Sequence, residues 1–309
     1  MAKNIKILTG ITVLLIAILF SCSKARIEKP VEEIINNNQN EITELLKFVP
    51  LDNYFSSKAK EAEIFNFTFP YTPTQYYPRT TEGTIIASTK VLFTTLSDDT
   101  IDYPYIISIN EFYKLKDVIY TNRQLVYNNK LLSLFGMYNI RFSKNGSPLK
   151  LKTGKTYSFY SQYHTTEIAS DSLPIFIGND WSMSNNEFIG DSTYFYGYLN
   201  ITGWLLFGKE TNFNASNYTT LNFTSNKYDL TNVGIYIVFS DKNTFTRVQN
   251  QESINLPVGE QAKLVAFGIT EKGKLYSYSK EIIIGEETSY SIDLTTTNDA
   301  FLTSMLDSL

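Results

Sequence analysis

The chain has 309 residues, a formal net charge of −4 and 15% aromatic residues, among them 21 Phe and 22 Tyr. This mildly acidic balance, without a basic patch, argues against a nucleic-acid partner and against a purely electrostatic attachment to anionic lipid. The chain has one Cys, which rules out an internal disulfide bond, so we expect a core rich in aromatic side chains to stabilise the fold.

The first predicted element is a secretory signal at residues 1–21. Lys3 and Lys6 precede an apolar run at residues 7–20, which ends in Ser21-Cys22. A basic start, a short apolar stretch and a small residue before the cleavage point are typical of such signals. The ending, Leu19-Phe20-Ser21-Cys22, resembles the bacterial lipobox. That resemblance implies cleavage between Ser21 and Cys22, and attachment to Cys22 of diacylglycerol and usually of a further acyl chain such as palmitate.

Two other interpretations of this segment are less favoured. A helix needs about 20 apolar residues to cross a bilayer, whereas this run is shorter and is interrupted by Thr9, Gly10 and Thr12. A plain secretory signal is the second alternative, but the one Cys of the chain lies at the cleavage position. Because two or more acyl chains make membrane attachment stable, we expect a lipid-anchored protein of the Gram-negative outer membrane, on either its periplasmic or its cell-surface face.

Residues 22–61 are predicted to form a tether with short helices. Pro30 suits the first position of one helix, and Asn40 suits the cap of a second. The second helix would carry one apolar stripe, made of Ile42, Leu45, Leu46 and Val49. Such a stripe usually packs on the protein's own core, which is the interpretation we favour, and docking of a partner is the alternative.

From residue 62 the apolar residues recur at every second position, which is typical of β-strands. In one such run Tyr138, Ile140 and Phe142 alternate with Asn139, Arg141 and Ser143. This alternation predicts a strand with one buried and one exposed face. Asn145-Gly146 is the strongest turn signal in the chain, and residues 233–239, apolar on both faces, predict a central strand.

The last part of the chain continues this pattern and then changes to a helix. Residues 263–269 and 275–284 flank Glu271-Lys272-Gly273 as a predicted hairpin. Thr297 or Asn298 is expected to cap a short C-terminal helix. Its predicted apolar stripe consists of Phe301, Leu302, Met305, Leu306 and Leu309. The fold class is therefore all-β, with two β-sandwich-like domains at residues 62–185 and 186–309, divided within the polar stretch 182–191.

Part of the chain resembles a group of uncharacterised bacterial outer-membrane lipoproteins. The matching segments are Asp117-Val118-Ile119, Lys130-Leu131-Leu132, Gly136-Met137-Tyr138-Asn139-Ile140, Asn145-Gly146, Gly203-Trp204, residues 234–241 and Leu256-Pro257-Val258-Gly259-Glu260. The N-terminal domain of that group is a β-sandwich similar to the one in zonula-occludens and netrin-receptor proteins. The resemblance implies a fold and an envelope location, and no chemistry.

The sequence gives little support for catalysis, a metal site or a cofactor. His164 is the one histidine, and no nucleophile elbow, phosphate-binding loop or zinc-protease motif is present. Loop carboxylates could serve a carbohydrate-active enzyme; the candidates are Asp98, Asp99, Asp102, Asp171, Asp180 and Asp191. His164-Thr165-Thr166 resembles the His-x-Thr of self-cleaving β-hairpins, in which the histidine activates the threonine hydroxyl. We expect no enzyme activity and no cofactor. The alternatives are a carbohydrate-active enzyme and a self-cleaving protein.

Two further patterns concern binding and modification. Aromatic residues gather at 194–198, where their rings either bind glycans or fill the core, and Trp181 and Trp204 carry the same ambiguity. Four segments resemble a bacterial O-glycosylation sequon; they would be modified at Thr100, Ser172, Ser192 and Ser308. The sequence thus predicts a non-enzymatic, lipid-anchored envelope protein that binds a protein or glycan partner, or that has a purely structural role.

Overall fold

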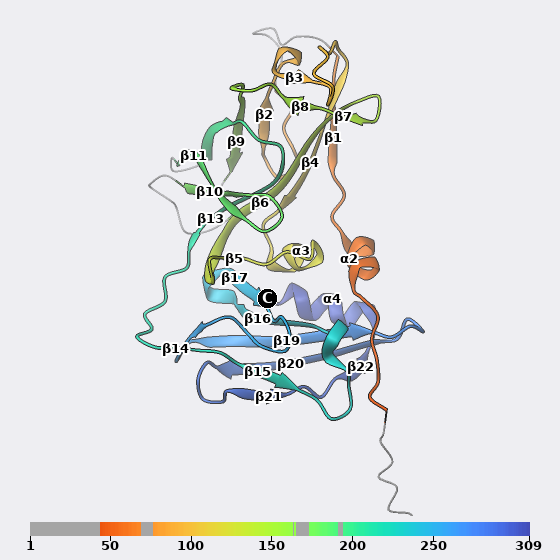
Figure 1. Ribbon diagram of the computed structural model, residues 1–309, viewed down its shortest axis with the longest axis vertical. Helices are drawn as coiled ribbons and strands as arrows, with labels where there is room; N and C mark the ends of the chain where they lie inside the picture. Colours follow the sequence, from red (N-terminus) through yellow and green to blue (C-terminus); the bar gives the residue numbers. More distant parts are fainter. Residues whose placement is uncertain (1–43, 69–76, 163, 165–172, 191–193) are drawn as a thin grey trace, which may run out of the picture. The chain divides into compact units, whose positions relative to one another are not determined.

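The computed structural model describes residues 44–68, 77–162, 164, 173–190 and 194–309. Within these residues the protein is mostly β, with a curled sheet and a short C-terminal helix, so the predicted fold class is confirmed (Figure 1). None of the helices in the described ranges is long and apolar enough to cross a membrane. The predicted signal segment, Cys22 and the start of the tether lie outside the described residues.

The larger sheet is antiparallel and takes its strands from the first part of the chain. In spatial order it contains β1 (Glu63–Phe67), β4 (Tyr105–Phe112), β6 (Lys130–Lys144), β13 (Gly203–Glu210), β10 (Leu173–Ile177), β11 (Ser182–Gly190), β12 (Tyr194–Leu199), β9 (Tyr157–Gln162) and β2 (Ile85–Ala87). Short strands β5 (Val126–Tyr127) and β7 (Ser147–Pro148) pair with β6, and β3 (Phe93–Thr94) pairs with β8 (Lys150–Leu151). The turn before β7 is the predicted one, with positive φ angles of 50° at Asn145 and 79° at Gly146.

Aromatic side chains fill the inner face of this curled sheet. The ring centroids of Phe188 and Phe207 are 4.8 Å apart, and those of Phe159 and Phe207 are 5.4 Å apart. Phe195 joins the same cluster from β12, with its centroid 5.0 Å from that of Phe207. Phenylalanine and tyrosine rings bury large areas, so this cluster supplies the core that the composition predicted.

The sheet extends past the predicted domain boundary. β11 runs across residues 185 and 186, and β12 and β13 belong to the same sheet. The chain leaves this sheet only after Glu210. The polar composition of residues 182–191 suggested a linker, but strand pairing uses backbone N–H and C=O groups, which a polar strand offers as well as an apolar one. Both sheets lie within one compact unit, residues 45–309.

The second sheet has the order β17 (Thr244–Arg247), β16 (Gly234–Phe239), β19 (Gln261–Ile269), β20 (Leu275–Ile283) and β22 (Thr295–Thr297). All six residues of β16 are buried and the strand is paired on both sides, which confirms the predicted central strand. β19 and β20 form the predicted hairpin. Two small pairs accompany this sheet: β14 (Tyr218–Thr219) with β18 (Leu256–Pro257), and β15 (Asn222–Thr224) with β21 (Ser289–Ser291). Short 3₁₀ turns lie at Lys90–Leu92, Leu230–Asn232 and Ser240–Lys242.

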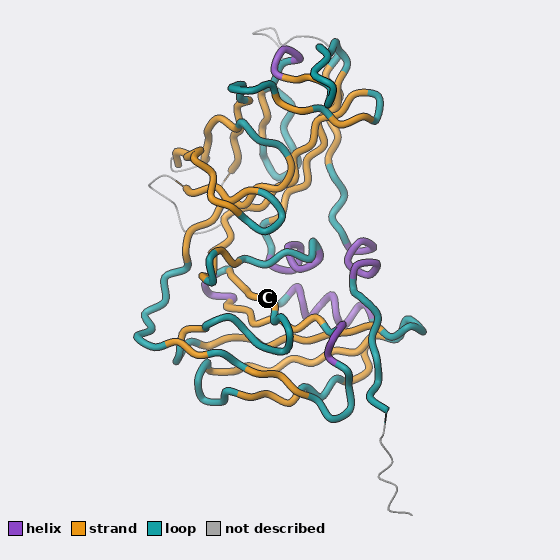
Figure 2. Tube along the Cα trace, viewed as in Figure 1, coloured by secondary structure: helices purple, strands orange, loops and turns teal. Residues whose placement is uncertain are grey.

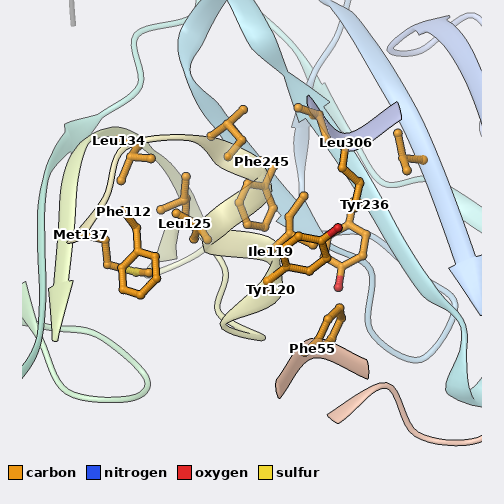
Figure 3. Packing of buried hydrophobic residues seen from close by; sticks show 14 of the residues in the cluster. Phe55, Phe112, Ile119, Tyr120, Leu125, Leu134, Met137, Tyr236, Phe245 and Leu306 are labelled. Carbon is orange, nitrogen blue, oxygen red and sulfur yellow. The ribbon is translucent and has the colours of Figure 1, made fainter. Parts of the chain in front are cut away.

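Three helices pack against one face of the second sheet: α2 (Asp52–Lys58), α3 (Leu115–Tyr120) and α4 (Asp299–Asp307) (Figures 1 and 2). Figure 3 shows Phe55 of α2 and Tyr120 of α3 beside Tyr236 of β16. The Phe55 ring meets that of Phe267 on β19 edge-on, with centroids 6.1 Å apart. α2 is also tied to α4, because the Tyr54 hydroxyl donates to Asp299 Oδ1 at 3.0 Å.

The end of the predicted tether is therefore part of the fold. The helix predicted after Asn40 is wrong in its described part, because Leu46 and Val49 form isolated β-bridges with Tyr228 and Ile269. The helix begins only at Asp52. Backbone hydrogen bonds to these distant residues replace the local helical ones, which a local apolar stripe cannot reveal.

Asn298 has the role predicted for it, whereas Phe301 and Asn139 differ from their predicted environment. Asn298 caps α4, since its side chain accepts a hydrogen bond from the Phe301 backbone N–H. Phe301 itself is 59% exposed, so it does not belong to the buried stripe. Asn139, predicted on an exposed face, is only 4% exposed, because residues of α2 and α3 cover that face of β6.

Candidate functional site

The aromatic segment at residues 194–198 forms β12, and its residues alternate between the two faces of the larger sheet. Phe195 and Leu199 point into the core. Tyr196 is 37% exposed and Tyr198 is 66% exposed on the outer face. Gly197 lies on the inner side, where an added Cβ would approach the Phe188 ring to 2.8 Å. The strand can therefore lie close over the core only with glycine there.

The outer face of β12 and its neighbours carries what we call the tyrosine face: Tyr160, Tyr194, Tyr196 and Tyr198. Strand register places Tyr196 opposite Tyr160 on β9, and Tyr160 opposite Ile85 on β2. On the other side of β12, Tyr196 is opposite Ile189 of β11, which is exposed. Adjacent strands lie about 4.8 Å apart. The row across the four strands, Ile85, Tyr160, Tyr196 and Ile189, is therefore about 14 Å long.

The tyrosine rings of this row lie close together. The Tyr160 and Tyr196 rings are nearly parallel, at 18°, with centroids 5.9 Å apart. Gln162 extends the face, donating from Nε2 to the Tyr194 hydroxyl at 3.2 Å. The outer positions of β2, β9 and β12 carry no charged side chain. The exposed Arg79, which pairs with Ile85, lies at the edge of this surface. A surface of aromatic rings with hydroxyl tips suits a flat ligand that has both apolar and hydroxyl-bearing faces.

The two tryptophans lie elsewhere and pack around an arginine that sequence reasoning missed. Trp181, in the turn between β10 and β11, is buried and donates from Nε1 to the Gln124 carbonyl at 2.7 Å. The Arg123 guanidinium lies 4.0 Å from the ring centroid of Trp204 and 5.5 Å from that of Trp181. Burial lowers the pKa of Arg123 to about 10. Trp181 therefore belongs to the core rather than to an exposed binding face.

The candidate catalytic acids occupy turns and ion pairs. Asp98 pairs with Lys150 at 2.9 Å, and Asp102 pairs with Lys90. The hydrogen bond from Lys90 holds the pKa of Asp102 below its usual value. Asp99 accepts from the Thr95 hydroxyl at 3.2 Å. Asp171 and Asp191 lie outside the described residues, and Asp180 lines a hollow with Arg123 and Arg247. In the described ranges no three His, Cys, Asp or Glu side chains come together as a metal site would require.

His164 lies beside a tyrosine. Its ring stacks on that of Tyr113 with centroids 3.8 Å apart, and its Nε2 lies 2.9 Å from the Glu82 carbonyl oxygen. Thr165 and Thr166 of the self-cleavage motif lie outside the described residues. The contacts of the imidazole are therefore known, and self-cleavage at His164-Thr165-Thr166 stays a prediction.

A buried acidic network close to His164 was missed. Glu111 is 2% exposed and accepts from the Tyr113 hydroxyl at 3.1 Å. The hydroxyls of Tyr113, Tyr138 and Ser161 lie 2.7 to 3.2 Å from one another. Burial raises the pKa of Glu111. The signal was present in the sequence, because Glu111 continues the inward alternation of β4 after two buried isoleucines.

Two of the four predicted glycosylation positions are described, and both are exposed. Thr100 forms an isolated bridge with Thr94. Ser308, after α4, donates to the Met305 carbonyl oxygen at 2.7 Å and accepts from Lys263 at 2.9 Å. Ser172 and Ser192, like Ser21 and Cys22, lie outside the described residues. Exposure is compatible with modification and does not establish it.

Compared with protein-family models, with curated proteins and with solved structures, the chain matches none.

Proposed function

We propose that the chain is a lipid-anchored, non-enzymatic protein of the Gram-negative outer membrane that binds a glycan through the tyrosine face. The anchoring part rests on the basic, apolar and Ser21-Cys22 segments of the sequence. The binding part rests on one observation: four tyrosines on the outer face of β9 and β12, two of them with nearly parallel rings.

The chemistry of this face favours a neutral glycan as its ligand. The apolar C–H face of a sugar ring packs on an aromatic ring, and sugar hydroxyls exchange hydrogen bonds with tyrosine hydroxyls and with Gln162. Aromatic residues are also enriched in protein–protein interfaces, around which the rim is polar and often charged. The outer positions of β2, β9 and β12 carry no charge, and Arg79 lies at the edge beside Ile85, so we take a protein partner as the less favoured occupant.

The binding test compares the tyrosine face with an exposed tyrosine elsewhere. Affinity electrophoresis through gels containing neutral polysaccharides (xylan, mixed-linkage β-glucan and α-glucan) should retard the wild-type chain in at least one gel. The double variant Tyr160→Ala, Tyr196→Ala should lose at least tenfold in affinity. The control Tyr218→Ala, which removes a ring that is 56% exposed on β14, should migrate as wild type.

Three results would contradict glycan binding through this face. They are no retardation in any gel, retardation that survives the double variant, and equal loss in the control. Shortened polysaccharide after incubation would instead favour the carbohydrate-active alternative, and two fragments on a denaturing gel would favour self-cleavage. Capture of a protein partner by wild type but not by the double variant would replace the glycan as the occupant.

The anchor is tested separately at Cys22. Cells fed labelled palmitate should label the wild-type chain, and the Cys22→Ser variant should lose the label and leave the membrane fraction. If the Cys22→Ser variant keeps both the palmitate label and its place in the membrane fraction, lipid attachment at this residue is excluded. Protease treatment of intact and lysed cells then distinguishes the cell-surface face from the periplasmic face.

A further inference from the structure

A second surface of the larger sheet is hollowed into a cleft of about 310 Å³. It lies between α2, the end of α3 and the outer face of β4, β6 and β13. Its lining combines aromatic rings with amides, hydroxyls and three charged side chains, which are Asp52, Lys60 and Arg141. A hollow of this size with a few convergent polar groups is typical of small-molecule sites.

Strand register brings the floor of this cleft together. Asn110 of β4 is opposite Asn139 of β6, and Asn139 is opposite Trp204 of β13. The side chain of Asn139 is nearly buried, and its amide oxygen accepts from Arg141 Nε at 3.3 Å. The buried amide thus fixes the position of Arg141, which is itself exposed at the rim.

The wall of the cleft is aromatic. The rings of Phe112 and Trp204 stack at 27° with centroids 5.6 Å apart. Phe55 and Tyr120 contribute from α2 and α3, with centroids 6.4 Å apart, and Figure 3 shows them together with Phe112. The wall is rigid because these four residues also pack in or against the core next to the second sheet.

The charges of the cleft leave one cation available. Lys60 is paired with Glu82 at 3.1 Å, and Asp52 Oδ1 accepts from the Asn122 amide at 3.3 Å. Arg141 forms no ion pair with the part of the chain that the structure describes. A guanidinium presents a planar fork of N–H donors that matches a carboxylate in two parallel hydrogen bonds. An oxyanion such as a carboxylate would therefore be held at the rim by Arg141.

We infer that this cleft binds an acidic sugar unit, a monosaccharide that carries a carboxylate. The carboxylate binds Arg141, and the apolar face of the ring lies against Trp204, the one of the four wall rings that is only half-buried. A sugar hydroxyl donates to the amide oxygen of Asn110, the residue whose Nδ2 donates to the Lys60 carbonyl oxygen at 2.8 Å. The site uses β4, β6 and β13, whereas the tyrosine face uses β9 and β12. It is therefore a second site, independent of the proposed neutral-glycan surface.

The chain reports on this site through its own fluorescence, because it has two Trp and one of them lines the cleft. Wild-type protein is titrated with glucuronate, with a trigalacturonate and with glucose, by tryptophan fluorescence and calorimetry. Both uronates should bind saturably and glucose should not. Binding of glucuronate alone points to a free monosaccharide as the ligand, and tighter binding of trigalacturonate points to an acidic polysaccharide. No saturable binding of either uronate overturns the inference.

Variants then test the residue that carries the inference. Arg141→Gln should weaken uronate binding at least tenfold, and the control Arg79→Gln, an exposed arginine outside the cleft, should bind as wild type. Should circular dichroism show Arg141→Gln unfolded, Arg141→Lys replaces it and should still bind severalfold more weakly, because an ammonium lacks the planar fork. Wild-type affinity in the folded variant overturns the inference. The double variant of the tyrosine face should bind uronate unchanged, which separates the two proposals.

Discussion

Replacing Phe55 by alanine tests whether residues before the first strand belong to the folded core. Phe55 is 2% exposed, although it lies in the segment predicted to be a tether. Its ring contacts Tyr54, Tyr120 and Phe267, which belong to α2, α3 and β19. Phe55 therefore packs the seven-residue helix α2 against both α3 and β19.

The magnitude follows from this burial. Removal of a buried phenylalanine side chain lowers the free energy of unfolding by about 3–5 kcal/mol, through lost transfer free energy and the cavity left behind. α2 is short and lies at the edge of the core, so it can shift to fill part of the cavity. We therefore expect a loss of about 3 kcal/mol for Phe55→Ala.

Urea unfolding followed by tryptophan fluorescence measures the difference. The midpoint should fall while the slope of free energy against urea stays unchanged, because the unfolded chain exposes a similar area. The control Phe301→Ala removes a ring that is 59% exposed on α4 and should change the free energy by less than about 0.5 kcal/mol. A loss below about 1 kcal/mol for Phe55→Ala would refute the packing of α2 against the second sheet.

Three further predictions test local features. Burial raises the pKa of Glu111 above its ordinary 4.5, so its contribution to stability is full below that value and is lost as pH rises through the raised folded value. Glu111→Gln should therefore reduce the fall in unfolding free energy as pH rises above about 4.5, and a fall equal to that of wild type would contradict this. At Gly208 an added Cβ would lie 2.8 Å from the Ser133 carbonyl oxygen, so Gly208→Ala should lose about 1–3 kcal/mol, and an unchanged Tm would show that the strands can separate there. Asn298 accepts from the Phe301 N–H at 2.9 Å, so Asn298→Ala should lose about 1 kcal/mol in urea unfolding, and no loss would show that the cap is dispensable.

Local chemistry made several elements predictable. Asn145-Gly146 adopts the positive φ angles that its residues tolerate best. The apolar run at β16 became a central strand, and Asn298 became a helix cap. Each of these depends on periodicity or on a backbone angle that a few adjacent residues determine. The aromatic segment at residues 194–198 left glycan binding and core packing open, and the structure shows Phe195 buried and Tyr196 exposed.

Other features needed the tertiary structure. The cleft brings Asn110, Asn139 and Trp204 into one row from three strands, and no local pattern indicates this because register between distant strands is set by the whole sheet. The tyrosine face likewise needs the pairing of Tyr160 with Tyr196.

The sequence by itself determined the all-β class, the turn at Asn145-Gly146, the central strand at residues 233–239 and the hairpin of β19 and β20. Only the tertiary structure decided that the polar β11 continues the larger sheet, that Leu46 and Val49 lie in extended segments rather than a helix, and that Asn139 is buried. The reason is physical: a side-chain pattern reports which face of a segment prefers burial, whereas backbone hydrogen bonds between distant segments decide what buries it.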